Sequence, residues 1–290
     1  MSSQGHFTLS FRLKSSADAR SVAEQLPALM PDFFISQDTI GTIHYSRFTL
    51  LNGKTLLFLG DFDGEFANVM ANLAGHAGPT FDAIFQHVDN PPPVPTADNI
   101  DAFLEWSEKH LLRAATLFSA YSDVSAKEIK AMAREAELSG ETKQLPFLVI
   151  LPIKSRMAYL EVEVLLRARD HKTQKDLATI GTPHFAQFIP LGNNQIGFFT
   201  VYDGSFDQYI ADLTKYIGPV FDLIFKFTKD PPHSPCRKHV QEFIDFAAAA
   251  SRTPIGFYQA YPNLSVQDIH SLIADAKAQS AANRSGATAA

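Results

Sequence analysis

The sequence predicts an α+β fold that is built twice in one chain. The 290 residues repeat themselves at a constant offset of 140 positions, and no gap is needed. Between Gly41 and Pro95, 20 of 55 positions are identical in the two copies, and each copy alternates strand-like and helix-like stretches. A chain of this length can form two domains of ordinary size. We predict a first repeat at residues 1–139, a linker at 140–146, a second repeat at 147–278 and a disordered tail at 279–290.

The first half of each copy is predicted to form a strand, a helix and two further strands. Phe7 to Leu13 alternates apolar and polar residues, which is typical of a strand with one buried face. Its counterpart, Phe147 to Ile153, contains no charged residue and is predicted to be buried on both faces. A helix follows near residues 16–30. Strands are expected at 42–50 and 55–62, joined by a hairpin turn at Asn52-Gly53.

The second half of each copy is mainly helical. Asp63-Gly64 introduces a helix, and Gly78-Pro79 opens another helical turn, since proline is tolerated at a first helical position. A proline-rich crossing leads to an amphipathic helix at 97–112 and a strand at 115–121. A last helix begins at Ser125 with a capping box, and Ser265 repeats it. The order β-α-β-β-α-(α)-β-α, twice, is a ferredoxin-like pattern with an added helix.

Two such four-stranded sheets can bury their open faces against each other. This arrangement resembles the dimeric α/β-barrel superfamily, fused into one chain over most of residues 7–276. The resemblance implies two tandem ferredoxin-like repeats packed as a pseudo-dimeric α/β barrel. The superfamily includes cofactor-free monooxygenases, lyases and isomerases, and also haem enzymes such as dye-decolourising peroxidases. Fold alone therefore does not select a chemistry.

Composition and charge exclude several classes of partner. The net charge of −6 offers no electrostatic footprint for nucleic acid. Cys236 is the only cysteine, which excludes an internal disulfide and a multi-thiolate metal site. The first residues lack the pattern of a signal peptide, and no apolar run reaches membrane-spanning length. We expect a soluble, cytoplasmic protein without nucleic-acid or membrane partners, and self-association as a homo-oligomer is left open.

His44 and His184 are the leading candidates for a functional site. Each lies in the second predicted strand of its copy, in a Gly-Thr-x-His-aromatic context. Strand alternation places them on the same face as the repeated residues Phe48 and Phe188. A titratable residue on a buried face suits a general base, a cofactor ligand or a pH-sensitive group. The alternative is a hydrogen-bonded core histidine that stabilises the interface between the repeats.

Tyr121 and Tyr261 close the fourth predicted strand of each copy. In the barrel that the resemblance implies, an edge of one sheet lies near an edge of the other. We therefore expect His44 to approach Tyr261 and His184 to approach Tyr121. Such a pair could transfer protons or orient a ligand. It could equally be a hydrogen bond that satisfies two buried polar groups.

Asp63 and Asp203 are repeated acidic residues at the start of a predicted helix. The segment Gly60 to Gly64 fits the Gly-x-x-Asp-Gly motif of dye-decolourising peroxidases, in which the aspartate helps to handle peroxide. The second copy lacks the first glycine, because it has Thr200 at that position. The favoured interpretation is a helix N-cap, a position that aspartate prefers.

The sequence leaves three functions open. The first is a haem-binding, peroxidase-like small-molecule oxidoreductase with His44 or His184 as the axial ligand. The second is a cofactor-free oxygenase, lyase or isomerase that acts on a hydrophobic or aromatic small molecule. The third is a non-catalytic protein that binds a hydrophobic ligand. Differences between the copies, such as Asp61 against Val201 and Arg47 against Gln187, favour chemistry in only one of them.

Overall fold

The computed structural model describes residues 4–138, 141 and 144–287. Within the first repeat, helices and strands alternate in nearly the predicted order. The long helix α1 is kept despite two internal prolines, and it ends at Gly41, whose φ of 72° is the left-handed conformation that glycine adopts at helix ends. The elements are β1 (Gln4–Arg12), α1 (Ser16–Ile40), β2 (Ile43–Leu51), β3 (Thr55–Asp63), α2 (Phe66–Phe85), η1 (Thr96–Asp98), α3 (Ile100–His110), β4 (Thr116–Ser119) and α4 (Ala126–Glu135).

The second repeat reproduces this order with one difference in the helix after the third strand. Helix α2 is kinked at Ala77, whereas its counterpart is divided into α6 and α7 at Ile217. The elements are β5 (Gln144–Pro152), α5 (Arg156–Ile180), β6 (Pro183–Gly192), β7 (Gln195–Asp203), α6 (Phe206–Tyr216), α7 (Gly218–Phe225), η2 (Cys236–Lys238), α8 (Val240–Ala250), β8 (Ile255–Gln259) and α9 (Val266–Ala287).

The strands form two four-stranded antiparallel sheets, which confirms the predicted α+β class. The strand orders are β1-β3-β2-β8 and β4-β6-β7-β5, so each repeat gives its fourth strand to the sheet of the other. A ferredoxin-like sheet would pair the fourth strand with its own first strand. Instead, the segment before β4 is hydrogen-bonded to β1, where the Leu112 amide donates to the Thr8 carbonyl over 2.8 Å. The chain then crosses to the other sheet and pairs with β6.

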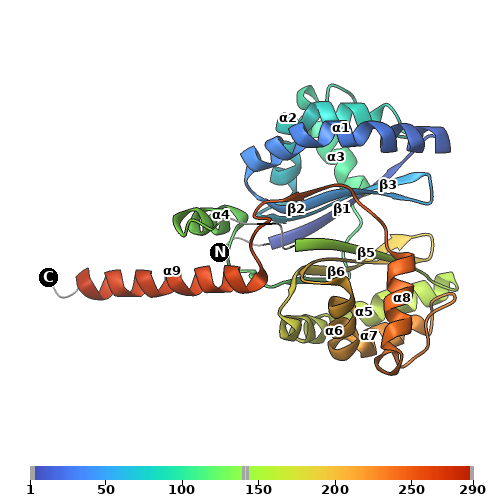
Figure 1. The fold of residues 1–290 in the computed structure, drawn as a ribbon. Helices are drawn as coiled ribbons and strands as arrows, with labels where there is room; N and C mark the ends of the chain where they lie inside the picture. Colours follow the sequence, from blue (N-terminus) through green and yellow to red (C-terminus); the bar gives the residue numbers. More distant parts are fainter. Residues whose placement is uncertain (1–3, 139–140, 142–143, 288–290) are drawn as a thin grey trace.

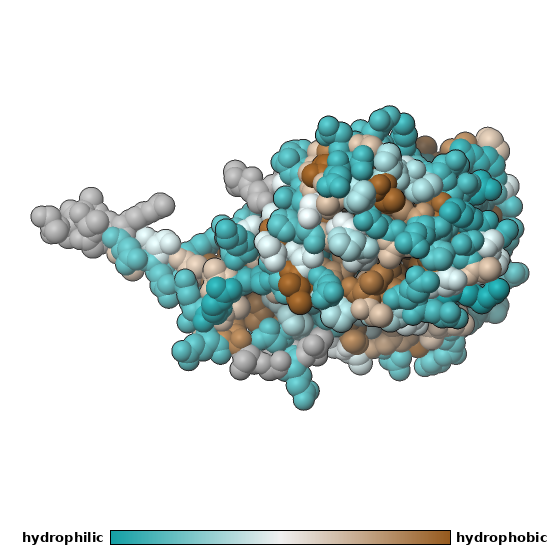
Figure 2. Space-filling view, turned by 90° about the horizontal axis from the view of Figure 1, so that it is seen from above, coloured by the Kyte–Doolittle hydropathy of each residue, from teal (hydrophilic) through white to brown (hydrophobic). Residues whose placement is uncertain are grey.

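Helices cover the outer face of each sheet, and the two sheets face each other (Figure 1). Helices α1, α2 and α3 lie over the first sheet, and α5 to α8 lie over the second. An apolar layer fills the space between the sheets, and it includes Leu57 and Leu59 from one sheet and Leu148 and Phe199 from the other. The face seen in Figure 2 is mostly hydrophilic, with scattered hydrophobic residues. Among the described residues, no helix is both long and apolar enough to cross a bilayer.

Helices α4 and α9 lie together at one end of the molecule, and α9 projects away from the sheets (Figure 1). Helix α9 continues to Ala287, past residue 278, where the second repeat was predicted to end. Strand β5 likewise begins at Gln144, inside the predicted linker. Residue 139 of the first predicted repeat, residues 140 and 142–143 of the predicted linker and residues 288–290 of the predicted tail lie outside the described residues.

Candidate functional site: a buried Asp–His–Tyr chain

The strand exchange brings each histidine to the tyrosine of the other repeat, as the sequence led us to expect. His44 Nδ1 lies 2.6 Å from the Tyr261 hydroxyl, and His184 Nδ1 lies 2.9 Å from the Tyr121 hydroxyl. Backbone hydrogen bonds fix this alignment, because the amide of Ala260 donates to the His44 carbonyl. The amide of Ala120 donates to the His184 carbonyl in the same way. Both histidines are fully buried.

Each histidine also contacts the repeated aspartate of its own copy. His44 Nε2 lies 3.0 Å from Asp63 Oδ1, and His184 Nε2 lies 2.8 Å from Asp203 Oδ1. A carboxylate only accepts hydrogen bonds, so the histidine Nε2–H is the donor in each pair. The Nδ1 atom of a neutral imidazole is then an acceptor and faces the tyrosine hydroxyl.

Asp63 and Asp203 are not the N-cap residues of the helices that follow them, so the favoured interpretation is wrong. The N-cap of α2 is Glu65 and that of α6 is Ser205. Instead, Asp63 Oδ2 accepts from the Ala126 amide at the start of α4, and Asp203 Oδ2 accepts from the Val266 amide at the start of α9. A carboxylate is favourable there because the first amides of a helix are unpaired and carry partial positive charge.

Tyrosine hydroxyls join the two halves into one continuous chain. Tyr121 and Tyr261 lie 3.0 Å apart, oxygen to oxygen, and Tyr45 adds a contact of 3.2 Å to Tyr121. The chain runs from Asp63 through His44, Tyr261, Tyr121 and His184 to Asp203. Burial, with neighbouring tyrosines as a second cause, raises the pKa of all three tyrosines well above its ordinary value. These hydroxyls therefore stay protonated and neutral at physiological pH.

The tyrosine hydroxyls of this chain have more contacts than hydrogens. The hydroxyls of Tyr45, Tyr121 and Tyr261 supply three hydrogens, one each. They make five contacts, three among the tyrosines and one to each histidine. When both imidazoles are neutral, two contacts therefore lack a hydrogen. A second proton on either imidazole would supply one of them.

Sequence reasoning missed Gln4, Gln144 and Tyr45. The side-chain amide of Gln4 donates to the carbonyls of Val124 and Tyr121, and Gln144 makes the equivalent bonds to Leu264 and Tyr261. The same 140-residue offset relates these two glutamines, so the repeat itself contained the signal. Tyr45 had no such signal, because its counterpart is Phe185.

A second polar cluster lies beside the buried Asp–His–Tyr chain, and its residues are not repeated at the 140-residue offset. Asp61 Oδ1 contacts His6 Nδ1 at 2.7 Å and accepts from Gln187 Nε2 at 2.5 Å. Arg47 is buried, and burial lowers the pKa of its guanidinium to about 10 while Asp61 opposes the shift. Arg47 Nε has no partner in the described part of the chain. The space beside these residues has almost no room for a water molecule, so the cluster is packed.

The geometry at His44 and His184 does not fit haem. An axial ligand needs a free ring nitrogen, and all four nitrogens already face an aspartate or a tyrosine. Five hollows in the described part of the chain are each lined by residues other than these histidines. Asp63 is similarly engaged by His44 and the α4 amide. No haem chemistry is therefore assigned to these residues.

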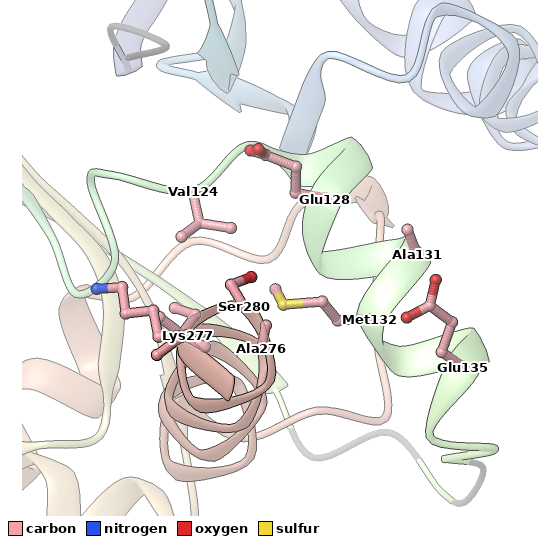
Figure 3. Close-up of a pocket in the computed structure, with 10 residues that line it drawn as sticks. Val124, Glu128, Ala131, Met132, Glu135, Ala276, Lys277 and Ser280 are labelled. Carbon is pink, nitrogen blue, oxygen red and sulfur yellow. The ribbon is translucent and has the colours of Figure 1, made fainter. Parts of the chain in front are cut away.

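A hollow lies at one end of the molecule, between α4 and α9 (Figure 3). Its volume is about 560 Å³. Met132 of α4 reaches toward Ala276 and Ser280 of α9, and Val124 closes one end (Figure 3). Glu128, Glu135 and Lys277 place charges on its walls and rim. We call this hollow the α4–α9 groove.

Comparisons with known proteins add little to this geometry. No family model and no curated protein matches the chain. Among solved structures, a "putative monooxygenase" of Lactobacillus acidophilus is similar at 9% identity and a TM-score of 0.41, covering 90% of this chain and 98% of that one. A "putative monooxygenase" of Fusobacterium nucleatum is 8% identical with a TM-score of 0.42, and the match covers 91% of this chain and 97% of that one. An anthrone oxidase-like protein is 9% identical with a TM-score of 0.34, and the match covers 89% of this chain and 94% of that one. Values this low carry no argument about chemistry, so function is argued from the site.

Proposed function

We propose that the protein is a ligand-binding pseudo-dimer that takes an apolar small molecule in the α4–α9 groove. The observation that carries this proposal is the groove itself. Its volume of about 560 Å³ lies within the roughly 300–1,000 Å³ typical of small-molecule sites. Val124, Met132 and Ile273 offer apolar contacts, and the charged groups sit where a polar end of a ligand could face water.

The buried chain has a structural role in this proposal. It joins the exchanged strands at the centre of the molecule and satisfies polar groups that are sealed from water. It also supports the groove, because Asp63 and Asp203 bind the first amides of α4 and α9. The two helices that line the groove are thus fixed to the two ends of one hydrogen-bonded chain.

The groove predicts a matched pair of substitutions on α9. Ala276 lines the groove, whereas Ala278 is exposed and lies about 200° further around the helix. We expect Ala276→Trp to weaken binding of the apolar dye 1-anilinonaphthalene-8-sulfonate at least about tenfold, because an indole would fill the hollow. Ala278→Trp should leave binding unchanged. Dye fluorescence titrations at fixed protein concentration measure both.

Equal dye binding by the two variants would contradict the proposal. The titration is paired with sedimentation of the dye-free protein, because a second copy of the chain could also cover the groove. Dimerisation that Ala276→Trp abolishes, with no saturable dye binding by the wild-type protein, would assign the groove to self-association and overturn the ligand proposal.

A small-molecule oxidoreductase or oxygenase without a cofactor is the second candidate. The specific observation in its favour is that the tyrosine hydroxyls of the Asp–His–Tyr chain have fewer hydrogens than contacts, since such a chain could accept a proton from an acidic substrate. Against it stands the packing of both histidines. Oxygen uptake with anthrone or a hydroquinone tests this candidate. Uptake that is absent from the wild-type protein, or unchanged in His44→Gln, would remove it.

A further inference from the structure

Two histidines and a glutamate lie together on the surface of the second repeat, and none of them belongs to the buried Asp–His–Tyr chain. His233 Nδ1 lies 2.8 Å from Glu242 Oε2, and His239 Nδ1 lies 3.8 Å from the same oxygen. One ligand atom from each of the three residues lies within 4.8 Å of those of the other two. All three side chains are accessible to solvent, with 79%, 42% and 41% exposure for His233, His239 and Glu242.

The local fold holds these side chains in place. His239 is the N-cap residue of α8, and Glu242 follows three positions later in its first turn. The Glu242 carboxylate accepts from the backbone amide of His233 at 2.9 Å, which attaches the preceding loop to the helix. The Glu242 carboxylate therefore lies within reach of both imidazoles.

The first repeat provides an internal comparison for this cluster. At the 140-residue offset, the positions of His233, His239 and Glu242 are occupied by Pro93, Asn99 and Ala102. The first repeat has the same turn and helix, η1 and α3, at these positions. The fold therefore does not require the two histidines and the glutamate, and their grouping is specific to the second repeat.

We propose that His233, His239 and Glu242 form a binding site for a divalent transition metal of the zinc class. Two imidazoles and one carboxylate are a known protein ligand set for Zn²⁺, with a fourth position open to water. Metal–ligand bonds of about 2.0–2.1 Å place tetrahedral ligand atoms roughly 3.3 Å apart. The observed separations of 2.8 and 3.8 Å lie on either side of this value, so small side-chain rotations would complete the geometry.

Bound metal would join the loop before η2 to the first turn of α8. It would replace the present hydrogen bond between His233 and Glu242 by bonds from both residues to one cation. Cys236 is nearby in sequence, but its side chain is buried and its thiol lies against the Gly218 carbonyl. Burial is also the main cause that raises the pKa of this thiol to about 12, so a thiolate ligand is not part of the proposal.

Titration of the untagged protein with Co²⁺, followed by Zn²⁺ displacement, tests the site. We expect visible d–d absorption that saturates at one equivalent and disappears on addition of Zn²⁺, without a near-ultraviolet thiolate band. His239→Ala and Glu242→Gln should each weaken Co²⁺ binding at least about tenfold, the loss seen even for outer-shell partners of metal ligands. His76→Ala, at an exposed histidine outside the cluster, should bind as the wild-type protein does.

A triple variant gives the matched control for folding. His233→Pro, His239→Asn and Glu242→Ala together install the residues that the first repeat carries on the same backbone elements. This variant should keep the circular dichroism spectrum of the wild-type protein and lose the saturable Co²⁺ signal. Binding that survives in the triple variant, or a wild-type titration without saturation, would overturn the proposal.

Discussion

Replacing His44 by alanine is expected to lower the free energy of unfolding by about 3–5 kcal/mol, because it leaves the buried carboxylate of Asp63 short of a hydrogen-bond partner. His44 is fully buried, and its removal leaves Asp63 with only the Ala126 amide as partner. The Tyr261 hydroxyl loses its histidine acceptor at the same time. The lost imidazole also leaves a cavity, which adds to the cost. Urea unfolding followed by circular dichroism measures the change.

Three further variants separate this effect from a general loss of packing. His76→Ala, at an exposed position, should change the free energy of unfolding by less than about 0.5 kcal/mol. Tyr261→Phe keeps the ring and removes one hydroxyl, so we expect a loss of about 1–3 kcal/mol. The double variant should lose less than the sum of the single losses, because both substitutions break the same contact. Additive losses would contradict a connected chain.

The two ends of the chain should differ slightly. The side chain of Asp203 is 13% exposed, against 6% for Asp63. Water can therefore hydrate the Asp203 carboxylate more readily when its histidine is removed. We expect His184→Ala to be destabilising in the same direction as His44→Ala, and somewhat less so.

The pairing of His44 with Tyr261 was predicted from the internal repeat together with the barrel arrangement that the superfamily resemblance implied. A constant offset marked the histidines, tyrosines and aspartates as shared, and the expected proximity of sheet edges paired His44 with Tyr261. The same offset marks Gln4 and Gln144, which shows that a repeat carries more information than its most reactive residues. Gln4 was missed because a glutamine has no titratable group and lies before the first apolar strand residue.

The partner of Asp63 was not predictable from local pattern. An aspartate just before a helix suggests an N-cap of that helix, but its actual partner is the first amide of α4, 63 residues further along the chain. Tertiary placement decides this choice, since the strand exchange brings the start of α4 over the end of β3. The sealing of His44 and His184 was equally hidden, because strand alternation predicts a buried face and does not say whether a cavity remains there.

The exchange of β4 and β8 also depends on the path of the connecting chain. The apolar pattern of residues 115–121 predicts a strand and is compatible with either sheet. The backbone bond from Leu112 to Thr8 ends the contact with β1 and directs the chain toward β6. Arg252 makes the equivalent bond to the Leu148 carbonyl before β8. Such long-range pairings carry no periodic signature in sequence.

Alkaline pH is expected to unfold this protein steeply. Burial raises the pKa of Tyr45, Tyr121 and Tyr261 well above 10 in the folded state, whereas the unfolded chain ionises these residues near 10. A group with a raised folded pKa contributes stability that is fully present below its unfolded pKa. This contribution is lost as pH rises from about 10 toward the folded pKa, because the unfolded state releases a proton that the folded state keeps. Each tyrosine can remove up to about 1.4 kcal/mol per pH unit.

Tyr45→Phe isolates one of these contributions with little risk to packing. The second repeat already carries phenylalanine at the equivalent position, Phe185, on the same strand geometry. Free energies of unfolding measured by urea at pH 9, 10 and 11 should fall less steeply for this variant than for the wild-type protein. The difference should approach about 1.4 kcal/mol per pH unit above pH 10.

The lysines, the thiol and the other tyrosines titrate in both the wild-type protein and Tyr45→Phe, so their contributions to the pH dependence cancel in the comparison. Parallel pH dependences would mean that Tyr45 ionises equally easily in the folded and unfolded states, which requires water at the centre of the chain. The sealed arrangement of Tyr45, Tyr121 and Tyr261 would then be wrong, and a solvent path to His44 and His184 would return catalysis to the leading position. A shallower profile for Tyr45→Phe would instead support a dry polar joint, with the groove between α4 and α9 as the place where a ligand binds.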